Sequence, residues 1–339
     1  MKRPTIADIA QRAGVTKGSV SFALNGRPGV SATTRARIIA IAEELGWQPS
    51  SAARALSDGR TGAIGLVLDR PARTLGVELF YMQLISGIEA ELAAHGVALL
   101  LQVAEDRAAQ MAAYRRLWGE RRVDGMFLLN LYVDDERVPL LEELGMPVLV
   151  VGGPRGLGSL PGVWNDDPAA VRSVVQYLAA LGHRRIAHVT GMPGLWHTVI
   201  RTEAFDAATS SLGVTGMTVS TDYTGEQGAR ATRALLAGPQ APTAIFYDND
   251  VLAVSGLSVA AEMRVPVPGR LSLVAWDDSV LCELVHPALT AVSLDIAAYG
   301  GCAARRLLDL VAGQPVEGAC AATPVLVPRG STAPPAGQA

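Results

Sequence analysis

Several residue types and patterns are scarce in this chain of 339 residues, and each scarcity excludes a class of protein. The three cysteines, Cys282, Cys302 and Cys320, stand late and without the spacing of metal ligands, which excludes a disulfide framework and a zinc finger. No stretch approaches the roughly 18 consecutive apolar residues that a membrane span needs, and the polar N-terminus carries no apolar signal segment. These absences predict a soluble protein of the cytoplasm that does not contact a membrane.

Motifs that carry catalysis or bind cofactors are absent as well. No Gly-x-Gly-x-x-Gly follows a predicted strand, no glycine loop ends in Gly-Lys, and neither His-Glu-x-x-His nor Gly-x-Ser-x-Gly occurs. The five histidines are scattered, and Cys282 has no activating neighbours. The sequence therefore predicts a protein that is not an enzyme and that holds neither a metal nor a cofactor.

Length and charge indicate a small basic part attached to a larger acidic one. At 35.4 kDa the chain exceeds what one compact core usually holds. Residues 1–60 carry nine Lys or Arg and four Asp or Glu, about +5, whereas the remainder carries 20 and 28, about −8. A basic head on an acidic body is typical of a nucleic-acid-binding module joined to another domain.

Three short helices are predicted in residues 1–49. Thr5 is positioned to cap the first helix, with Asp8 completing an approximate capping box, and Gly14 ends it. Thr16 begins the second helix, and the third runs over Ser31–Gly46. Two short helices joined by a tight turn describe a helix-turn-helix, which the third helix covers. A small helical interaction domain is the alternative that the charge disfavours.

In a helix-turn-helix the second helix enters the major groove of DNA with its N-terminal side chains toward the bases. Here Lys17 is suited to guanine acceptors and Phe22 to a thymine methyl group. Four side chains are better suited to phosphate contacts, namely Thr16, Ser19, Ser21 and Asn25. Thr5, Gly18 and Ser31 complete the predicted DNA contacts. The alternative for each of them is an ordinary solvated surface residue.

These motifs resemble those of the lactose-repressor (LacI/GalR) family of bacterial regulators, and the resemblance continues almost to the tail. The segments that carry it are Thr5–Thr16, Val20-Ser21, Leu24-Asn25-Gly26, Val30-Ser31, Leu45–Pro49 and Ser51–Leu56. The family implies a homodimer on a pseudo-palindromic operator, with a hinge helix and linker at residues 50–60. Ala53 and Leu56 match DNA-contacting positions there, with Leu56 as the wedge that levers a base step apart in the minor groove. From the residues alone, Leu56 is an ordinary core leucine.

Two residues of the second helix depart from the family pattern. Gly18 offers no side chain and Phe22 cannot form a hydrogen bond, although many family members carry polar base readers at both positions. We therefore expect direct readout to rest on Lys17, and the shape of the DNA to carry more of the specificity.

The body of the chain alternates apolar strands with amphipathic helices, which predicts parallel sheets covered on both faces. The predicted strands are Ile64–Leu68, Val97–Val103, Met126–Leu129, Val148–Val151, Ile186–Thr190, Ala244–Tyr247, Leu271–Ala275, Leu289–Leu294 and Pro324–Val327. The predicted helices include Phe80–Ala94, Ala169–Leu181, Ile200–Ser211, Val251–Glu262 and Ile296–Val311. Two such series indicate two similar lobes, with the turn-rich stretch 152–162 as one crossover between them.

The resemblance implies a two-lobe α/β fold like that of periplasmic binding proteins. It places residues 61–160 in the first lobe and residues 161–291 in the second. It returns residues 292–328 to the first lobe, so that three crossings join the lobes. The Pro-, Gly- and Ala-rich tail, residues 329–339, is predicted to be disordered.

Acidic and amide residues gather at the predicted strand ends, where open parallel sheets bind ligands. They are Asp69, Asn130, Asp166, Asp248, Asn249, Asp277 and Asp295. Acceptors that converge from two lobes suit a polyhydroxylated ligand, to which Arg201 offers a forked donor. A single Asp at a strand end is more often a turn or helix cap, so the residues alone leave both interpretations open.

The resemblance adds weight to particular residues of this set. Arg201, Asn249 and Asp277 match positions that contact the effector in sugar-responsive members, and Asp69 matches a position in the first-lobe cleft. Two tryptophans are aromatic candidates for effector contacts. Trp196 lies with His197 in a loop that is expected to reach the cleft, and Trp276 is equally suited to stacking on a sugar or to packing in the core.

Together these features predict a homodimeric transcription regulator. We expect a repressor of sugar-metabolism genes whose operator affinity is controlled by a small effector, a sugar, bound between the lobes. A nucleobase or nucleoside is the alternative effector. A solute-binding protein would share the body, but the basic head and the lack of a signal segment count against it. A catalytic relic of the same fold would need a reactive constellation, and we find none.

Overall fold

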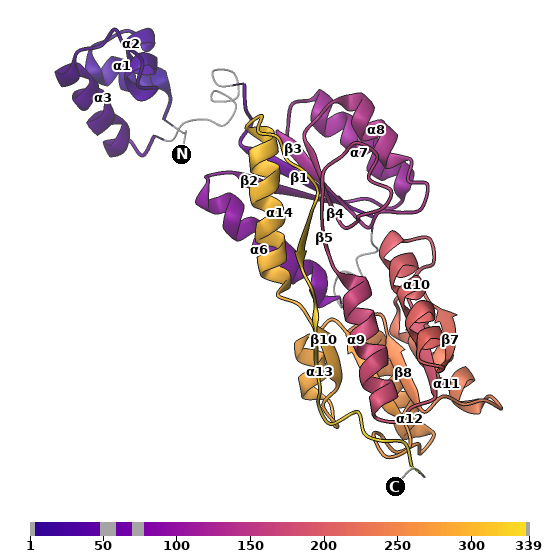
Figure 1. Ribbon diagram of the computed structural model, residues 1–339. Coiled ribbons are helices and arrows are strands. Elements are labelled where there is room, and N and C mark those ends of the chain that lie inside the picture. Colours follow the sequence, from indigo (N-terminus) through magenta and orange to yellow (C-terminus); the bar gives the residue numbers. More distant parts are fainter. Residues whose placement is uncertain (1–3, 48–58, 70–77, 337–339) are drawn as a thin grey trace. The chain divides into compact units, whose positions relative to one another are not determined.

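The computed structural model describes residues 4–47, 59–69 and 78–336. Two compact units divide the chain, Met1–Thr61 and Gly62–Ala339, and each has a core of its own (Figure 1). Among the described residues, no helix is long and apolar enough to cross a bilayer.

The N-terminal unit is built from three helices. They are α1 (Ile6–Ala13), α2 (Lys17–Leu24) and α3 (Ala32–Glu44). Each begins at a hydroxyl that accepts a hydrogen bond from a backbone N–H of the first turn, and these caps are Thr5, Thr16 and Ser31. Gly14 ends α1 in the left-handed conformation, which glycine adopts without strain. The predicted helix-turn-helix, covered by a third helix, is confirmed.

The first lobe of the C-terminal unit is a six-stranded parallel sheet in the order β11-β5-β4-β3-β1-β2. Its strands are β1 (Ala63–Leu68), β2 (Ala98–Val103), β3 (Gly125–Leu129), β4 (Val148–Val151), β5 (Gly162–Asn165) and β11 (Ala319–Ala322). One face packs against α6 (Leu79–Ala94) and α14 (Ile296–Val311), and the other against α7 (Arg107–Gly119) and α8 (Arg137–Leu144). Side chains alternate between the two cores, as for Leu66 and Val67.

The second lobe repeats this three-layer design with the order β12-β10-β9-β8-β6-β7. Its strands are β6 (Arg185–Thr190), β7 (Thr215–Ser220), β8 (Ala244–Tyr247), β9 (Ser272–Trp276), β10 (Thr290–Ser293) and β12 (Val325–Val327), of which β12 alone pairs antiparallel. One face packs against α9 (Asp167–Ala180) and α10 (Trp196–Ser211). The other packs against α11 (Gly225–Ala237), α12 (Asp250–Glu262) and α13 (Val280–Leu284). The predicted two-lobe fold with parallel sheets is confirmed.

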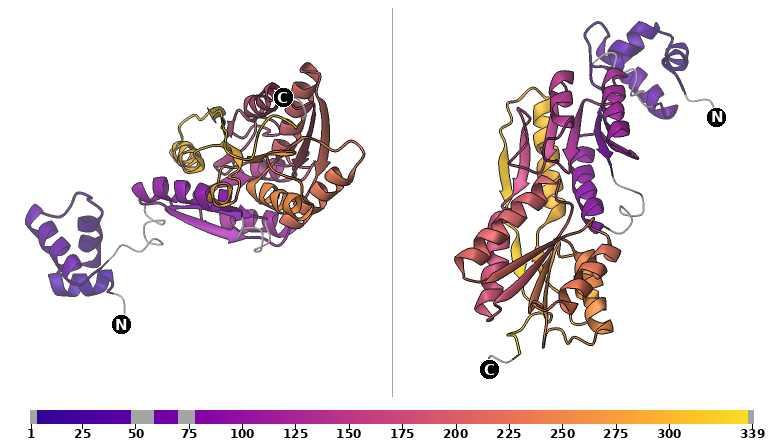
Figure 2. Two further views of the ribbon diagram at one scale, coloured as in Figure 1. Left: turned by 90° about the horizontal axis from the view of Figure 1, so that it is seen from below. Right: turned by 90° about the vertical axis from the view of Figure 1, so that its right-hand side faces the viewer.

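Helices α6 and α14 lie side by side although more than 200 residues separate them in sequence (Figures 1 and 2). Two glycines allow this close contact. A Cβ added at Gly87 would lie 1.9 Å from the carbonyl oxygen of Ala297, and one at Gly300 would lie 2.4 Å from that of Leu84. Because helix backbone meets helix backbone, no side chain fits at either position.

The predicted division between the lobes is wrong in three details. The stretch 152–162 joins β4 to β5 within one sheet, so the first crossing comes at Asn165–Asp166. Strand β10 belongs to the second lobe up to Ser293, and β12 pairs with β10 instead of returning to the first lobe. The segments that do return are α14 and β11. Strand β11 has the sequence Ala-Cys-Ala-Ala, which lacks the branched side chains that usually mark a strand.

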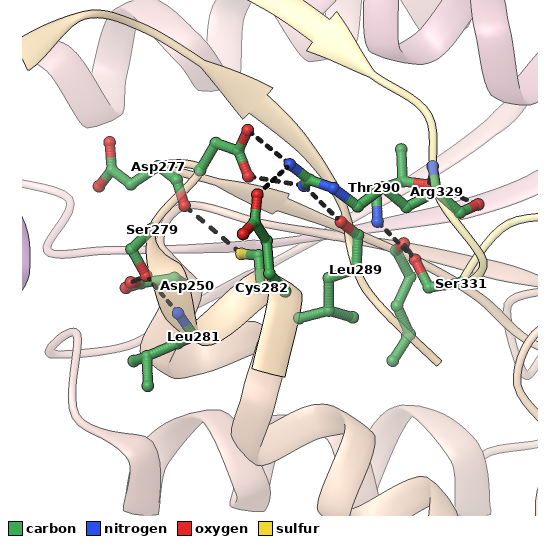
Figure 3. Close-up of polar contacts among 12 residues, drawn as sticks. Asp250, Asp277, Ser279, Leu281, Cys282, Leu289, Thr290, Arg329 and Ser331 are labelled. Carbon is green, nitrogen blue, oxygen red and sulfur yellow. Dashed lines mark hydrogen bonds and ion pairs between the residues drawn. The ribbon is translucent and has the colours of Figure 1, made fainter. Parts of the chain in front are cut away.

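The described part of the predicted disordered tail packs against the second lobe. Ser331 is fully buried; its Oγ donates to the carbonyl of Leu273 at 2.6 Å and accepts from the N–H of Thr290 at 2.8 Å. Arg329 forms an ion pair with Asp278 at 2.6 Å, and its Nη1 donates to the carbonyl of Leu289 at 3.0 Å (Figure 3). Composition predicts disorder because the tail has few apolar side chains, whereas hydrogen bonds to the sheet hold residues 329–333 in place.

Candidate functional site

The predicted DNA-reading residues lie on the surface of α2. Lys17 and Gly18 are exposed, and 42% of Phe22 is accessible to solvent. Val20 and Ala23 on the same helix are buried in the core of the unit. The helix therefore presents its predicted base readers to solvent and anchors itself by the opposite residues.

Hydroxyls that were predicted to contact phosphates also hold the ends of helices. Thr16 Oγ1 accepts from the N–H of Ser19 at 3.1 Å and lies 3.0 Å from Ser19 Oγ. Ser21 Oγ accepts from Asn25 Nδ2 at 3.4 Å. A hydroxyl has one donor and two acceptor positions, so these side chains keep hydrogen-bonding capacity for a phosphate oxygen.

The remaining predicted DNA contacts fall into two groups. Thr5 and Ser31 are exposed caps of α1 and α3, and the N–H of Thr5 donates to Asp8 Oδ2 at 2.7 Å, which completes the predicted capping box. Ala53 and Leu56, with the predicted hinge helix, lie outside the described residues.

Arg35 fixes the turn that follows α2, a role that the sequence did not reveal. Its guanidinium donates to the carbonyls of Ala23 at 3.3 Å and Arg27 at 2.6 Å. In the same turn a Cβ added at Gly29 would lie 3.3 Å from the ring of Phe22. The turn thus packs against the exposed ring and orients it.

A cavity lies between the two lobes of the C-terminal unit, at the carboxyl ends of the strands. Six of the seven predicted effector contacts line it: Asn130, Trp196, Arg201, Asn249, Trp276 and Asp277. The seventh, Asp69, is not among the lining residues; its Oδ2 accepts a hydrogen bond from the hydroxyl of Tyr132 at 3.2 Å.

Arg201 is held in the cavity wall by two carboxylates and an aromatic ring. Its Nε donates to Asp167 Oδ2 at 2.8 Å, and its Nη1 lies 4.0 Å from Asp248 Oδ1. The guanidinium carbon stands 3.8 Å from the centroid of the Trp276 ring. Burial acts to lower the pKa of Arg201, but the two carboxylates outweigh it and raise that pKa. Arg201 is therefore a fixed cation with donors to spare for a ligand.

Asp248 is fixed from both sides although it is almost fully buried. Its Oδ1 lies 2.8 Å from His188 Nε2, and its Oδ2 accepts from the N–H of Gly191 at 3.2 Å. Burial opposes ionisation, yet His188, Arg201 and the backbone N–H together lower the pKa of Asp248. The carboxylate thus stays charged and positions the neighbouring loop at the cavity wall.

Asp277 differs from Asp248 because the effect of burial on its pKa outweighs that of its charged neighbours. Burial raises the pKa of Asp277 to about 8; the Arg201 guanidinium opposes this rise, and the neighbouring Asp250 and Glu78 carboxyls add to it. A carboxyl with that pKa is mostly protonated at neutral pH. It can therefore donate a hydrogen bond to a ligand as well as accept one.

Several of the polar residues at strand ends cap helices, which was the alternative interpretation of such residues from the sequence. Asp166 Oδ1 accepts from the N–H of Ala169 at 3.0 Å, and Asp295 Oδ1 accepts from that of Ala298 at 2.8 Å. Asn249 caps α12 with its Oδ1 and lines the cavity as well. Its amide nitrogen has no hydrogen bond to the described residues, and Asn130 Nδ2 donates to the hydroxyl of Tyr81 at 2.8 Å.

Much of the cavity wall was not predicted from the sequence. The additional lining residues with aromatic or polar side chains include Glu78, Phe80, Tyr81, Trp164, Asn165, Asp167, Tyr223, Asp250 and Tyr299. Asn165 Oδ1 is buried and accepts no hydrogen bond from the described residues. The sequence does place Trp164 and Asn165 directly before the capped helix α9, which could have indicated a site there. The short strand β5 that positions them was not recognised.

The cavity combines aromatic faces with converging donors and acceptors. Three of the five tryptophans of the chain line it, namely Trp164, Trp196 and Trp276. Such a wall suits a compact ligand that has hydroxyl groups on its edges and apolar faces. No group of three or more His, Cys, Asp or Glu side chains in the described part of the chain is arranged to hold a metal ion.

Two family models match the chain. The model of the LacI family of bacterial regulatory proteins matches residues 5–50, which hold the three helices of the N-terminal unit. The model of a periplasmic binding protein-like domain matches residues 175–332, which include most of the second lobe.

Known proteins resemble the chain over nearly its whole length. The HTH-type transcriptional regulator CelR of Thermobifida fusca is 30% identical and covers 93% of this chain and 94% of that protein. The HTH-type transcriptional regulator MalR of Streptomyces coelicolor is 31% identical and covers 98% of each. A solved structure described as a complex of the transcriptional regulator CelR with cellobiose is 28% identical, with a TM-score of 0.75 over 97% of this chain and 100% of that chain.

Proposed function

Since the chain belongs to the LacI family of bacterial regulatory proteins, we propose that it is a homodimeric repressor of sugar-metabolism genes. It acts in the cytoplasm, where each protomer reads one half of a pseudo-palindromic operator through α2. A sugar in the interlobe cavity sets the affinity for that operator.

The wall of the cavity is the observation that supports a sugar. The Trp276 ring lies beside the fixed Arg201 guanidinium, and the Asp277 carboxyl lines the same cavity with a raised pKa of about 8. A pyranose offers an apolar face to such a ring and hydroxyls to such polar groups. The charged residues of the described wall are mainly carboxyls, which disfavours an anionic ligand such as a sugar phosphate.

The proposed regulation is a coupling between two sites of one molecule. The cavity is bounded by both lobes, so a bound sugar contacts both and favours the lobe arrangement in which its contacts are best. Such couplings are typically worth about 1–3 kcal/mol, or roughly 5- to 150-fold in operator affinity.

A thermal-shift screen of the full chain against sugars, sugar phosphates, nucleobases and nucleosides tests the effector class. A sugar present at about 100 times its dissociation constant should add roughly 2.7 kcal/mol to the stability. The shift should vanish in Arg201→Ala and Asp277→Ala and persist in Lys17→Ala, the matched control on α2. A shift from nucleobases alone would replace the sugar by that ligand class, and a blank panel would overturn the sugar proposal.

Base readout is tested by the same Lys17→Ala variant on DNA. Because Gly18 offers no side chain and Phe22 no polar group, we propose that Lys17 carries direct readout. The variant should then lose discrimination between operators that differ at the guanine that Lys17 reads, whereas preferences set by the shape of the DNA should remain. An unchanged ranking of operators would contradict this assignment.

A further inference from the structure

Two loops, one from each lobe, meet across the cleft in a short piece of antiparallel pairing. Residues 131–133 follow β3 in the first lobe, and residues 194–196 precede α10 in the second. The N–H of Val133 donates to the carbonyl of Gly194, and the N–H of Trp196 donates to the carbonyl of Leu131, both at 2.9 Å. Tyr132 and Leu195 pair between these two bonds. We call residues 131–133 and 194–196 the interlobe clasp.

The side chains of the clasp are exchanged between the lobes. Tyr132 belongs to the first lobe, yet its ring packs against the core of the second, beside the fully buried Leu195. Trp196 belongs to the second lobe, yet its ring packs against the core of the first. Each lobe therefore seats an aromatic residue of the other, so that separating the lobes exposes both rings to water.

Residues of the first lobe hold both aromatic side chains in place. The hydroxyl of Tyr132 donates to Asp69 Oδ2 at 3.2 Å, and the guanidinium of Arg107 lies 4.1 Å from its ring centroid. The indole of Trp196 rests on Gly156, where an added Cβ would lie 2.2 Å from Nε1. These contacts give the clasp a defined geometry in place of a loose surface contact.

The clasp and the cavity share a wall. Leu131 and Trp196 line the cavity, whereas Tyr132 does not. The same cavity is lined by Asn165 and Leu294, which stand where the chain crosses from one lobe to the other. A ligand in the cavity therefore contacts the clasp and the crossings at once.

From this arrangement we propose that the interlobe clasp holds the lobes closed over the cavity and that Trp196 links occupation of the cavity to the orientation of the lobes. Leu131 and Trp196 belong to the clasp and also line the cavity, so a ligand that shifts either side chain changes the pairing of the two loops. The second half of this inference rests on the proposed function, because it invokes an effector. The first half concerns the lobes alone and is tested without a ligand.

Backbone hydrogen exchange of the full chain, measured by mass spectrometry, tests closure with Tyr132→Ala and the matched control Tyr132→Phe. Tyr132→Ala removes the ring from the other lobe and no wall residue of the cavity. We expect exchange to rise at least tenfold in residues 131–133, in 194–196, and in the crossing segments 162–166 and 292–296. Tyr132→Phe keeps the ring and loses only the hydrogen bond to Asp69, so its exchange should lie much closer to that of the wild type than that of Tyr132→Ala does. An increase confined to residues 131–133, or no increase, would overturn the proposal.

A reversible crosslink provides the opposite perturbation, because the disulfide replaces the contacts of the Tyr132 ring by a covalent bond between the lobes. The two hydrogen bonds flank the pair Tyr132 and Leu195, and such non-hydrogen-bonded pairs have Cα atoms about 4.5 Å apart, within the range of disulfides. The variant combines Tyr132→Cys and Leu195→Cys with Cys320→Ser, which removes the exposed native thiol. Oxidation should slow exchange in the crossing segments at least tenfold relative to the reduced protein, and equal exchange in both forms would contradict closure by the clasp.

The effector link is then measured on the same crosslinked protein with any sugar found in the screen. Oxidation should slow release of that sugar at least tenfold, and unchanged release would refute the link between the clasp and occupation of the cavity. If the screen yields no sugar, the exchange measurements still decide the closure. Failure of the sugar proposal and failure of the clasp are therefore distinguishable.

Discussion

Asp277 shows how one residue combines backbone strain with an unusual charge state. It follows β9 with a φ of 62°, in the left-handed region that favours glycine. The main chain compensates, because the carbonyl of Asp277 accepts from the N–H of Ser279 at 3.0 Å and from the Cys282 thiol at 3.6 Å (Figure 3). A residue held in such a conformation beside a cavity is a feature of binding sites.

The raised pKa of Asp277 predicts a pH-dependent stability. Burial raises the pKa to about 8 from the ordinary 3.8, so between those values the folded chain binds a proton that the unfolded chain lacks. Stability from this group therefore falls as the pH rises from about 4 to about 8. The Asn side chain of Asp277→Asn does not titrate, so the variant avoids this loss. The difference in melting temperature, variant minus wild type, should therefore increase from pH 5 to pH 8. A constant difference between Asp277→Asn and the wild type over this pH range would contradict the raised pKa.

The sequence allowed part of the candidate site to be predicted residue by residue. Arg201 and Asp277 were found because they match family positions, and Asp277 also follows an apolar strand. Asp167 and Trp164 were missed because their importance comes from where β5 places them, and that strand has only four residues. Asp69 was assigned to the cleft wall by position, but its carboxylate faces Tyr132, a contact between segments 63 residues apart that no local pattern contains.

At the scale of elements, the contact between α6 and α14 depends on glycine. Gly87→Ala would place its Cβ 1.9 Å from the carbonyl of Ala297, so one helix must move and the first-lobe core must loosen. Overpacking of this kind costs about 1–3 kcal/mol, which should appear as a lower midpoint in urea unfolding. Gly119→Ala in α7 is the control, since no atom lies within 4 Å of its added Cβ. Equal midpoints for the two variants would show that the helices yield without cost.

The C-terminal segment is a second element whose effect can be measured. Ending the chain after Pro328 removes the Ser331 hydroxyl, so that the buried N–H of Thr290 and carbonyl of Leu273 lose a partner. Each unsatisfied buried group costs about 1–3 kcal/mol, and the melting temperature should fall. Ending the chain after Ala336 keeps residues 329–333 and should leave the melting temperature unchanged. A chain ending at Pro328 that melts like the full chain would contradict a stabilising tail.

Elements with strong periodicity were predictable, and those defined by long-range pairing were not. The buried strands β4 and β8 and the helix α14 agree with their predicted ranges because apolar runs and caps mark them locally. Strand β12 was assigned to the wrong lobe because its partner β10 lies more than 30 residues earlier and runs antiparallel to it. Pairing of that kind is decided by the assembled sheet and leaves no mark on three residues of sequence.

At the scale of the whole molecule, the two units have separate cores and the chain passes from one to the other at residues 61 and 62. The cavity and its wall lie entirely within residues 62–339. The basic residues of the predicted DNA reader, in contrast, lie in the N-terminal unit. The two activities should therefore be separable by dividing the chain at that point.

A chain that begins at Gly62 should melt cooperatively and keep the thermal shift caused by the effector, because it retains every described residue of the cavity wall. It should lose binding to operator DNA, since the helices that enter the groove are gone. In the full chain, Lys17→Ala should keep the thermal shift and weaken binding to the preferred operator only in part, because the predicted phosphate contacts remain. Loss of the thermal shift in the shortened chain would mean that the N-terminal unit or the linker contributes to the cavity, and would contradict the independence of the two units.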